Sequence, residues 1–213
     1  AVLSGQSLEE RLDLALLLGA EAYDILDSRQ SRSTMLAALE AYPGLTGILH
    51  APQGLLPLEV AFSPDGSRLA AAGRDATVFW DLDTGRLAGE PWQQAATHGD
   101  MNVFRTLDYS PEGTTLATGG CGEFDAEDTC LHGEITLWDA DTAQIHNRLQ
   151  GHAYTVRGLA YDATGRRLAS CGDETVLIWN VEDVAQASIE RTLAGHTTPV
   201  AAVAFSPDGA LLA

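Results

Sequence analysis

The chain has 213 residues, 45% of them hydrophobic, which is enough for one domain or one and a half with a packed core. Its formal net charge is −18, and all 12 basic residues are arginine. This acidic balance disfavours binding to nucleic-acid phosphates. No apolar run reaches the roughly 18 residues that a membrane-spanning helix needs. We therefore expect neither a nucleic-acid partner nor a membrane partner.

The cysteine content gives information on the compartment. Three cysteines are present, an odd number without the spacing of a disulfide framework. A reducing cytoplasm is the location that this usage predicts. Because the sequence starts with Ala1 rather than Met, it gives no information on a targeting segment.

Residues 1–43 are predicted to form a short helical hairpin that acts as a linker segment. In residues 7–26, apolar side chains recur with the period of a helix, for example at Leu8, Leu12 and Leu16. Ser7 and Glu10 have the spacing of a capping box at the start of this helix. A second helix over residues 31–42 is expected to end before the Pro-Gly pair at 43–44.

One sequence unit recurs along the rest of the chain. Its anchor aromatic residues are Phe62, Tyr109, Tyr161 and Phe205, spaced by 47, 52 and 44 residues. A period in the forties, with alternating apolar residues and turn signals, is typical of β-propeller blades. Helical solenoids of similar period are disfavoured, because no unit contains a long stretch with helical periodicity.

The first unit illustrates the predicted strands. In residues 58–62, every second side chain is apolar and shares one face of a strand. The SPDG segment at 63–66 has the composition of a tight turn. A strand of small residues over 67–73 and a strand over 77–81 follow. The latter is apolar on both faces, as expected for a sheet sandwiched between two others.

The matched aromatic and Gly-His pairs make the chain resemble the WD40-repeat β-propeller family over residues 45–213. These pairs are Trp80–Asp81, Trp138–Asp139, Trp179–Asn180, Gly151–His152 and Gly195–His196. The resemblance implies a mainly β fold: an incomplete propeller over residues 44–213 with four-stranded antiparallel blades. We expect three blades, near 51–91, 92–149 and 150–194, and the start of a fourth at 195–213. Such a piece of a ring would expose unpaired edges at both ends.

The resemblance also implies a buried structural network of His, Ser or Thr, Asp and Trp. In the third repeat its members are His152, Ser170, Asp173 and Trp179. A hairpin one residue shorter than the family pattern leaves the phase of Ser170 open. The remaining members in other repeats are Asp75, Trp80, Trp138 and His196. We expect these histidines to be buried structural groups rather than catalysts.

The second repeat contains an insertion. The anchor aromatic and the Trp are 29 residues apart there, against 18 in the first and third repeats. The extra residues lie in the segment CGEFDAEDTCLHG at 121–133. We expect a solvated acidic loop that binds no metal and no cofactor. Two alternatives are a zinc site built from Cys121, Cys130 and His132, and a Cys121–Cys130 disulfide.

The resemblance places this insertion on the same face as the turns that carry the Gly-His pairs, where partners often dock. Arginine is favoured at interface hot spots. A rim of three arginines beside an acidic loop would suit a protein or peptide partner. The candidate residues on this partner-binding face are Arg74, Arg105, Arg157, Glu123, Phe124 and Asp125.

The chain contains no recognisable catalytic motif; without lysine it has no phosphate-binding loop. The family resemblance therefore implies a non-catalytic protein-interaction scaffold. The predicted helix pair followed by repeats resembles the segment before the propeller in bacterial STAND-type signalling NTPases. That would make the chain a sensor or regulatory propeller in contact with upstream and downstream domains. The alternative is a propeller enzyme, or one that binds a metal or small ligand through loops of this face.

Overall fold

The computed structural model describes residues 49–52, 55–73, 76–92, 104–127 and 129–213. The chain divides into two compact units, residues 1–50 and 51–213. All described strands lie in the second unit. The predicted helices at 7–26 and 31–42, and the predicted boundary after residue 43, lie outside the described residues.

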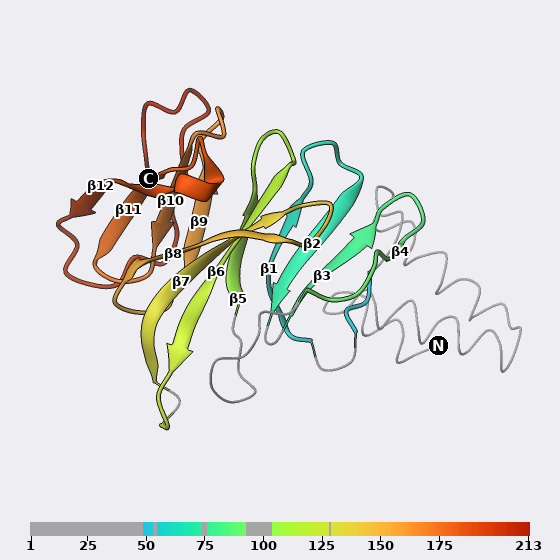
Figure 1. Ribbon diagram of the computed structural model, residues 1–213, viewed down its shortest axis with the longest axis horizontal. Helices are drawn as coiled ribbons and strands as arrows, with labels where there is room; N and C mark the ends of the chain where they lie inside the picture. Colours follow the sequence, from blue (N-terminus) through green and yellow to red (C-terminus); the bar gives the residue numbers. More distant parts are fainter. Residues whose placement is uncertain (1–48, 53–54, 74–75, 93–103, 128) are drawn as a thin grey trace, which may run out of the picture. The chain divides into compact units, whose positions relative to one another are not determined.

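The described chain forms three four-stranded antiparallel sheets, each a meander in sequence order (Figure 1). The first comprises β1 (Pro57–Phe62), β2 (Arg68–Gly73), β3 (Thr77–Asp81) and β4 (Arg86–Leu87). The second comprises β5 (Phe104–Tyr109), β6 (Thr115–Phe124), β7 (Cys130–Asp139) and β8 (Ile145–His152). The third comprises β9 (Gly158–Tyr161), β10 (Arg167–Cys171), β11 (Thr175–Asn180) and β12 (Ser188–Ala194), with a short 3-10 helix η1 (Val184–Gln186) between β11 and β12. The mainly β architecture with blade-like sheets is confirmed.

The turns between first and second strands form because their polar side chains bond to their own backbone. In the first blade, the Ser63 hydroxyl donates to Asp65 Oδ1 at 2.6 Å, and the Ser67 backbone N–H donates to the same oxygen at 3.0 Å. These bonds lower the pKa of Asp65 to about 2. Gly66 takes the positive φ of 72° that this turn requires.

The blades pack face to face through two apolar clusters. One cluster contains Ala70 and Phe79 of the first blade together with Leu107 and Trp138 of the second. A separate cluster joins the second and third blades. It includes Leu137 of β7, Leu159 of β9 and Leu177 of β11. The third strands β3, β7 and β11 are buried where they lie between blades, at residues 77–80, 133–138 and 176–179, as the sequence predicted for sandwiched sheets.

The first strands of successive blades lie side by side, and carboxylates link them. Leu107 donates its backbone N–H to Glu59 Oε2 at 3.0 Å, from the second blade to the first. Tyr161 donates its backbone N–H to Asp108 Oδ2 at 2.7 Å, from the third blade to the second. Burial raises the pKa of Asp108 to about 6. These acidic side chains therefore serve as links between blades.

A further hairpin follows the third blade. Phe205 pairs with Leu212, and Ser206 donates its backbone N–H to the Leu211 carbonyl at 2.9 Å. Val203 and Phe205 pack on the outward face of the third blade. Arg167 places its guanidinium 5.4 Å from the centre of the Phe205 ring. This segment has the position of the predicted fourth unit.

No described residue packs over the outward face of β1. Val60 is 54% exposed and Phe62 is 65% exposed. Their counterparts in the second blade, Leu107 and Tyr109, are only 3% and 7% exposed, because the first blade covers them. The exposed side chains of Val60 and Phe62 thus form an apolar row on β1. Within the described part of the chain, no helix is long and apolar enough to cross a membrane.

Candidate protein-interaction face

His152, at the end of β8 in the second blade, and three side chains of the third blade form the polar network that the resemblance implied. The Ser170 hydroxyl lies 2.8 Å from His152 Nε2 and accepts a hydrogen bond from Trp179 Nε1 at 2.8 Å. His152 Nδ1 lies 3.2 Å from Asp173 Oδ2, an electrostatic contact rather than a well-aligned hydrogen bond. All four side chains are buried. The shorter hairpin therefore leaves Ser170 in the correct phase.

The other blades contain only parts of this network. In the second blade, Trp138 donates its Nε1–H to the Thr118 hydroxyl at 2.8 Å. In the first blade, Trp80 is buried, but Ala71 stands at the register position of Ser170 and Thr118 and has no hydroxyl. Asp75 lies outside the described residues.

The predicted place of His196 in a buried network stays a prediction. The His196 side chain is exposed. The His152 imidazole lies against the Ser170 hydroxyl of β10, whereas the described residues after His196 form a hairpin in which Phe205 pairs with Leu212.

The Asp173 carboxylate of this network also binds the start of the segment that connects the second blade to the third. Its Oδ2 accepts the backbone N–H of Ala153 at 3.0 Å, and its Oδ1 accepts from the backbone and hydroxyl of Thr175. Burial by itself would raise the pKa of Asp173, but these hydrogen bonds outweigh it and the pKa is lowered. The carboxylate is therefore charged, and it fixes where the loop at 153–157 begins.

The rest of this loop is clamped between two blades. Val156 donates its backbone N–H to the Gly120 carbonyl at 3.0 Å, and Arg157 donates to the Cys171 carbonyl at 2.7 Å. A Cβ added at Gly133 would lie 2.2 Å from the Tyr154 carbonyl oxygen. The loop thus presses directly on β7, where only glycine leaves room for it.

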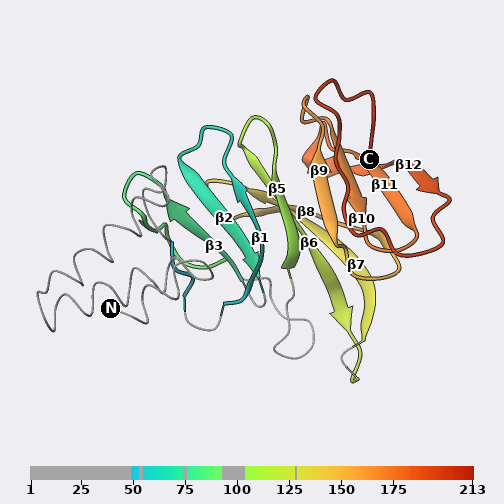
Figure 2. The same cartoon turned by 180° about the vertical axis from the view of Figure 1, so that it is seen from behind.

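The insertion in the second blade lengthens two strands instead of forming the predicted loop. The strands β6 and β7 continue to Phe124 and from Cys130, so that only a short turn separates them. In Figures 1 and 2 this hairpin extends beyond the ends of the neighbouring strands. The expectation of a solvated acidic loop is corrected: the inserted residues pair with one another across the hairpin, with bulges between Cys121 and Phe124.

Cys121 and Cys130 form a disulfide across this hairpin, with Cα atoms 5.8 Å apart. Their sulfurs are therefore not available as thiolate ligands. No group of three metal-ligating side chains occurs among the residues that the structure describes. The third cysteine, Cys171, is buried, and burial raises the pKa of its thiol to about 11.

The predicted zinc candidate His132 has a different setting. Its Nε2 lies 3.2 Å from the Gln150 side-chain amide of β8. The same amide donates to Glu134 at 3.1 Å, and Arg148 pairs with Glu134 at 2.8 Å. This row of polar contacts braces the extended hairpin against β8.

The structure brings together only some of the residues predicted for partner binding. Arg105 and Arg157 are exposed, and each precedes the anchor aromatic of its blade by four residues. Both flank the Gly119–Gly120 segment of β6: Arg105 lies at the bulge opposite it, and the loop preceding β9 bonds to it. Arg74 lies outside the described residues.

The acidic tip of the hairpin differs from its predicted role. Asp125 Oδ1 accepts the backbone N–H groups of Glu127 and Thr129, both at 2.8 Å, so that this carboxylate closes the turn. Glu123 is exposed, and Phe124 is partly buried. Of the three, Glu123 has the freest side chain for a partner.

Two exposed apolar residues were missed in the sequence. Tyr154 is 57% exposed at the tip of the clamped loop, and Leu131 is about half exposed on the extended hairpin. A signal for Tyr154 existed, because it follows the Gly-His pair by two residues and so lies outside the strand pattern. Together with Arg105, Arg157 and Glu123, these two residues define what we call the hairpin face.

Three segments of the chain, residues 50–81, 143–180 and 187–213, match the WD40 family, described as WD domain, G-beta repeat. The chain carries WD40 repeats. The matched segments include Gly151 and His152 at the end of β8, and Trp80 and Trp179 of the first and third blades.

Several curated proteins share these repeats. WD repeat-containing protein SL1-17 of Schistosoma mansoni is 32% identical over 160 residues, which cover 73% of this chain and 46% of that protein. Protein Notchless of Drosophila melanogaster is 31% identical over 246 residues, covering 95% of this chain and 47% of that protein. The guanine nucleotide-binding protein subunit beta of Schizosaccharomyces pombe is 28% identical over 163 residues, covering 76% and 47%. The chain spans about half the length of these relatives.

Solved structures share the arrangement of blades. The crystal structure of RRP9 WD40 repeats superposes with a TM-score of 0.61 at 27% identity, covering 74% of this chain and 44% of that one. A chain of the mitotic checkpoint complex superposes with a TM-score of 0.58 at 18% identity, covering 79% and 52%. The second likeness concerns the fold alone.

Proposed function

We propose that this chain is a non-catalytic scaffold that binds a protein or peptide through its hairpin face. The observation that carries the proposal is the clamped loop at 153–157. Backbone bonds from two blades hold it, and it presents the exposed Tyr154 and Arg157. Aromatic and arginine side chains on a rigid support are the residues that dominate binding energy at protein interfaces.

The relatives support the same class of function. A guanine nucleotide-binding protein subunit is, by its name, part of a protein assembly. The sequence also lacks the motifs of an enzyme, and the carboxylates of the first strands are used as links between blades.

A comparison of variants tests this proposal. The tagged chain and its Tyr154→Ala and Arg157→Ala variants are recovered from the cells that produce it, and bound proteins are quantified by mass spectrometry. We expect one or more proteins to fall at least about tenfold in both variants, the loss that a hot-spot residue causes. Glu190→Ala on the exposed strand β12 is the matched control and retains them. Equal recovery in all variants would contradict the proposal.

We also propose the narrower setting of a sensor or regulatory propeller in a signalling protein such as a STAND-type NTPase. Its support is the sequence pattern of residues 7–42, which lies outside the described residues. The uncovered apolar row on β1 supports a contact with a further blade, since Leu107 and Tyr109 at the equivalent positions are covered by one. Reading the gene outward for a phosphate-binding loop tests the NTPase setting.

The alternative is a small-ligand or metal-binding propeller that uses loops of the hairpin face. The best candidate for a metal site was the inserted segment at 121–133, but its Cys121 and Cys130 form a disulfide and so supply no thiolate ligand. Titration of the intact chain with zinc, followed by calorimetry, tests what remains of this alternative.

A further inference from the structure

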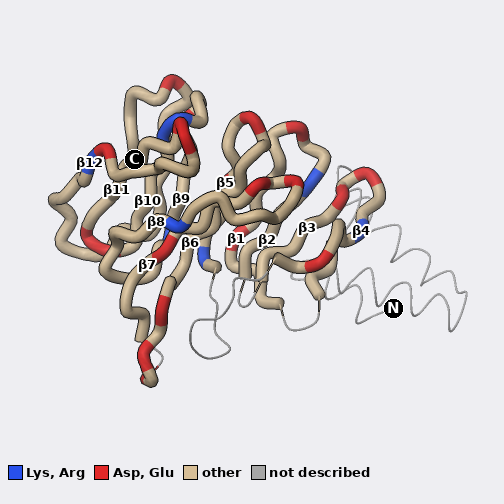
Figure 3. The backbone as a smooth tube through the Cα atoms, viewed as in Figure 1, with Lys and Arg blue, Asp and Glu red and all other residues tan. Residues whose placement is uncertain are grey.

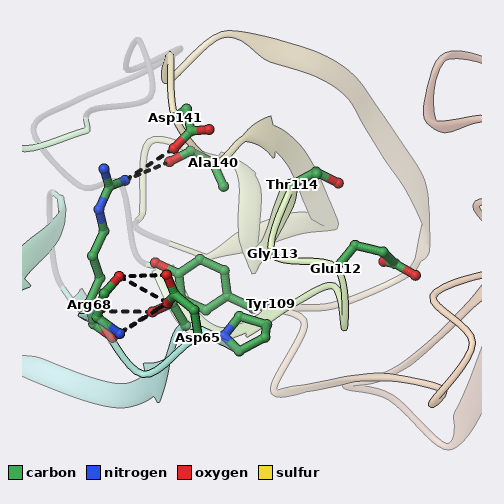
Figure 4. A pocket seen from close by; sticks show the side chains of 11 residues that line it. Asp65, Arg68, Tyr109, Glu112, Gly113, Thr114, Ala140 and Asp141 are labelled. Carbon is green, nitrogen blue, oxygen red and sulfur yellow. Dashed lines mark hydrogen bonds and ion pairs between the residues drawn. The ribbon is translucent and has the colours of Figure 1, made fainter.

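The ends of the blades opposite the hairpin face contain a pocket between the first and second blades. Its volume is about 270 Å³. Asp65 and Arg68 line it from the first blade, and Tyr109, Glu112 and Asp141 line it from the second. Figure 4 shows the Tyr109 ring in the middle of the pocket, with Asp65 and Glu112 to its two sides.

The Tyr109 side chain brings an unsatisfied polar group to this pocket. The residue is only 7% exposed, and its hydroxyl has no hydrogen-bond partner among the described residues. Burial raises the pKa of Tyr109 to about 12, so the hydroxyl is neutral at physiological pH. A buried hydroxyl without a partner is costly, and a ligand that bonds to it removes this cost.

The charges around this hydroxyl are mainly negative. Three carboxylates, those of Asp65, Glu112 and Asp141, line the pocket with one guanidinium, that of Arg68. Arg68 makes only long contacts, 3.4 Å to the Ala140 carbonyl and 3.5 Å to Asp141 Oδ1. The Asp141 side chain is 82% exposed and therefore accessible to a second cation. Figure 3 shows the acidic residues gathered at these turn tips.

We propose that this pocket binds a basic side chain, arginine or lysine, of a protein partner, which bonds to the Tyr109 hydroxyl and to the Asp141 carboxylate. A guanidinium carries several N–H donors in one plane and can serve both groups at once. The formal charge of −18 on the chain attracts such a partner.

Other ligand classes fit less well. An anion would face three carboxylates and only one arginine, so its charge is opposed. A metal ion needs several ligands around one point, and no such group of three exists in the described part of the chain. A side-chain cation on a flexible stem can instead reach groups that lie apart.

The same arrangement recurs one blade further on. A second pocket, of about 390 Å³, lies between the second and third blades and is lined by Tyr161 and again by Glu112. Tyr161 is 9% exposed, and its hydroxyl also lacks a partner among the described residues. The pockets are thus related by the repeat, and Glu112 is common to both. A segment with two basic residues could engage both pockets.

This inference rests on the proposed function, because it names the chemistry of a second protein-binding surface on the same scaffold. Its test uses the 213-residue chain and an arginine-containing peptide. An otherwise identical peptide with citrulline, which is neutral and of the same shape, is the ligand control. Affinity is measured by calorimetry at two salt concentrations.

The expected result is binding of the arginine peptide and little or no binding of the citrulline peptide. Asp141→Asn and Tyr109→Phe are each expected to weaken binding by about tenfold, the loss of one hydrogen bond to a charged group. Tyr109→Phe is expected to leave the unfolding midpoint unchanged or raised, because the hydroxyl bonds to none of the described residues in the free chain. A stable variant with weaker binding separates a ligand contact from a structural role.

Asp83→Asn is the matched control. Asp83 follows Trp80 by three residues, as Asp141 follows Trp138, but it is exposed outside both pockets. An equal loss in Asp83→Asn and Asp141→Asn would show general charge attraction and overturn the proposal. Full binding by Tyr109→Phe, or equal binding of the citrulline peptide, would overturn it as well. Variants of Tyr154 leave this assay unchanged, so its failure is distinguishable from failure of the hairpin face.

Discussion

Ser170 joins two buried side chains through one hydroxyl, which gives the first prediction. Ser170→Ala leaves His152 Nε2 and Trp179 Nε1 without their partner. We expect the free energy of unfolding to fall by about 2–4 kcal/mol, the cost of two unsatisfied buried groups. Chemical denaturation measures it. Ser170→Thr keeps the hydroxyl, as Thr118 does in the second blade, and should lose much less; equal losses would contradict the role of the hydroxyl.

Asp108 gives a prediction on pH. Burial raises its pKa from 3.8 to about 6 in the folded chain, so the folded state holds its proton more tightly than the unfolded state. The contribution of this group to stability is therefore present below about pH 4 and is lost as the pH rises through about 6. Asp108→Asn should flatten the dependence of unfolding free energy on pH between these values. An unchanged slope in denaturation series at several pH values would contradict it.

At the scale of elements, the extended β6–β7 hairpin depends on its disulfide. The two cysteines are 9 residues apart, and closing so short a loop stabilises a fold by about 2–3 kcal/mol. In the Cys121→Ser/Cys130→Ser double variant, we expect faster amide hydrogen exchange in Cys121–Phe124 and Leu131–Gly133. The amides of β11 are the internal control and should not change. If the amides of Cys121–Phe124 and Leu131–Gly133 exchange at the same rate with and without the disulfide, the prediction is contradicted.

The strands were predicted well where turn and packing signals agree. The third strand at 77–81 was placed at its observed bounds, because it is bounded by turn residues and apolar on both faces. The inserted segment at 121–133 was predicted to be a solvated acidic loop, because its many acidic residues are typical of loops. Its pairing across the hairpin has no signal in either strand alone.

The candidate site was predicted only in part, for a similar reason. The network around His152 followed from repeat spacing, but the display of Tyr154 depends on contacts with Gly133 and Gly120 of another blade. Such contacts between distant segments have no local sequence signal. The same is true of the pocket around Tyr109, which two blades build together.

At the scale of the whole molecule, covered and uncovered blade faces should differ in energy. Leu107→Ala removes a side chain buried between two blades, and we expect a loss of about 2–4 kcal/mol in unfolding free energy. Val60→Ala, at the equivalent position of the uncovered β1, should change it by less than about 0.5 kcal/mol. Urea denaturation of both variants checks this. Similar losses would mean that the face of β1 is covered in solution.

The central claim, that the hairpin face binds a protein, is tested most directly by site-specific photo-crosslinking in the producing cells. A photoreactive phenylalanine replaces Tyr154 in one variant and Glu190 of the exposed strand β12 in another. We predict a discrete crosslinked protein at position 154 that is absent at position 190. No adduct at position 154, or the same adducts at both positions, would contradict the assignment of this face as the binding surface.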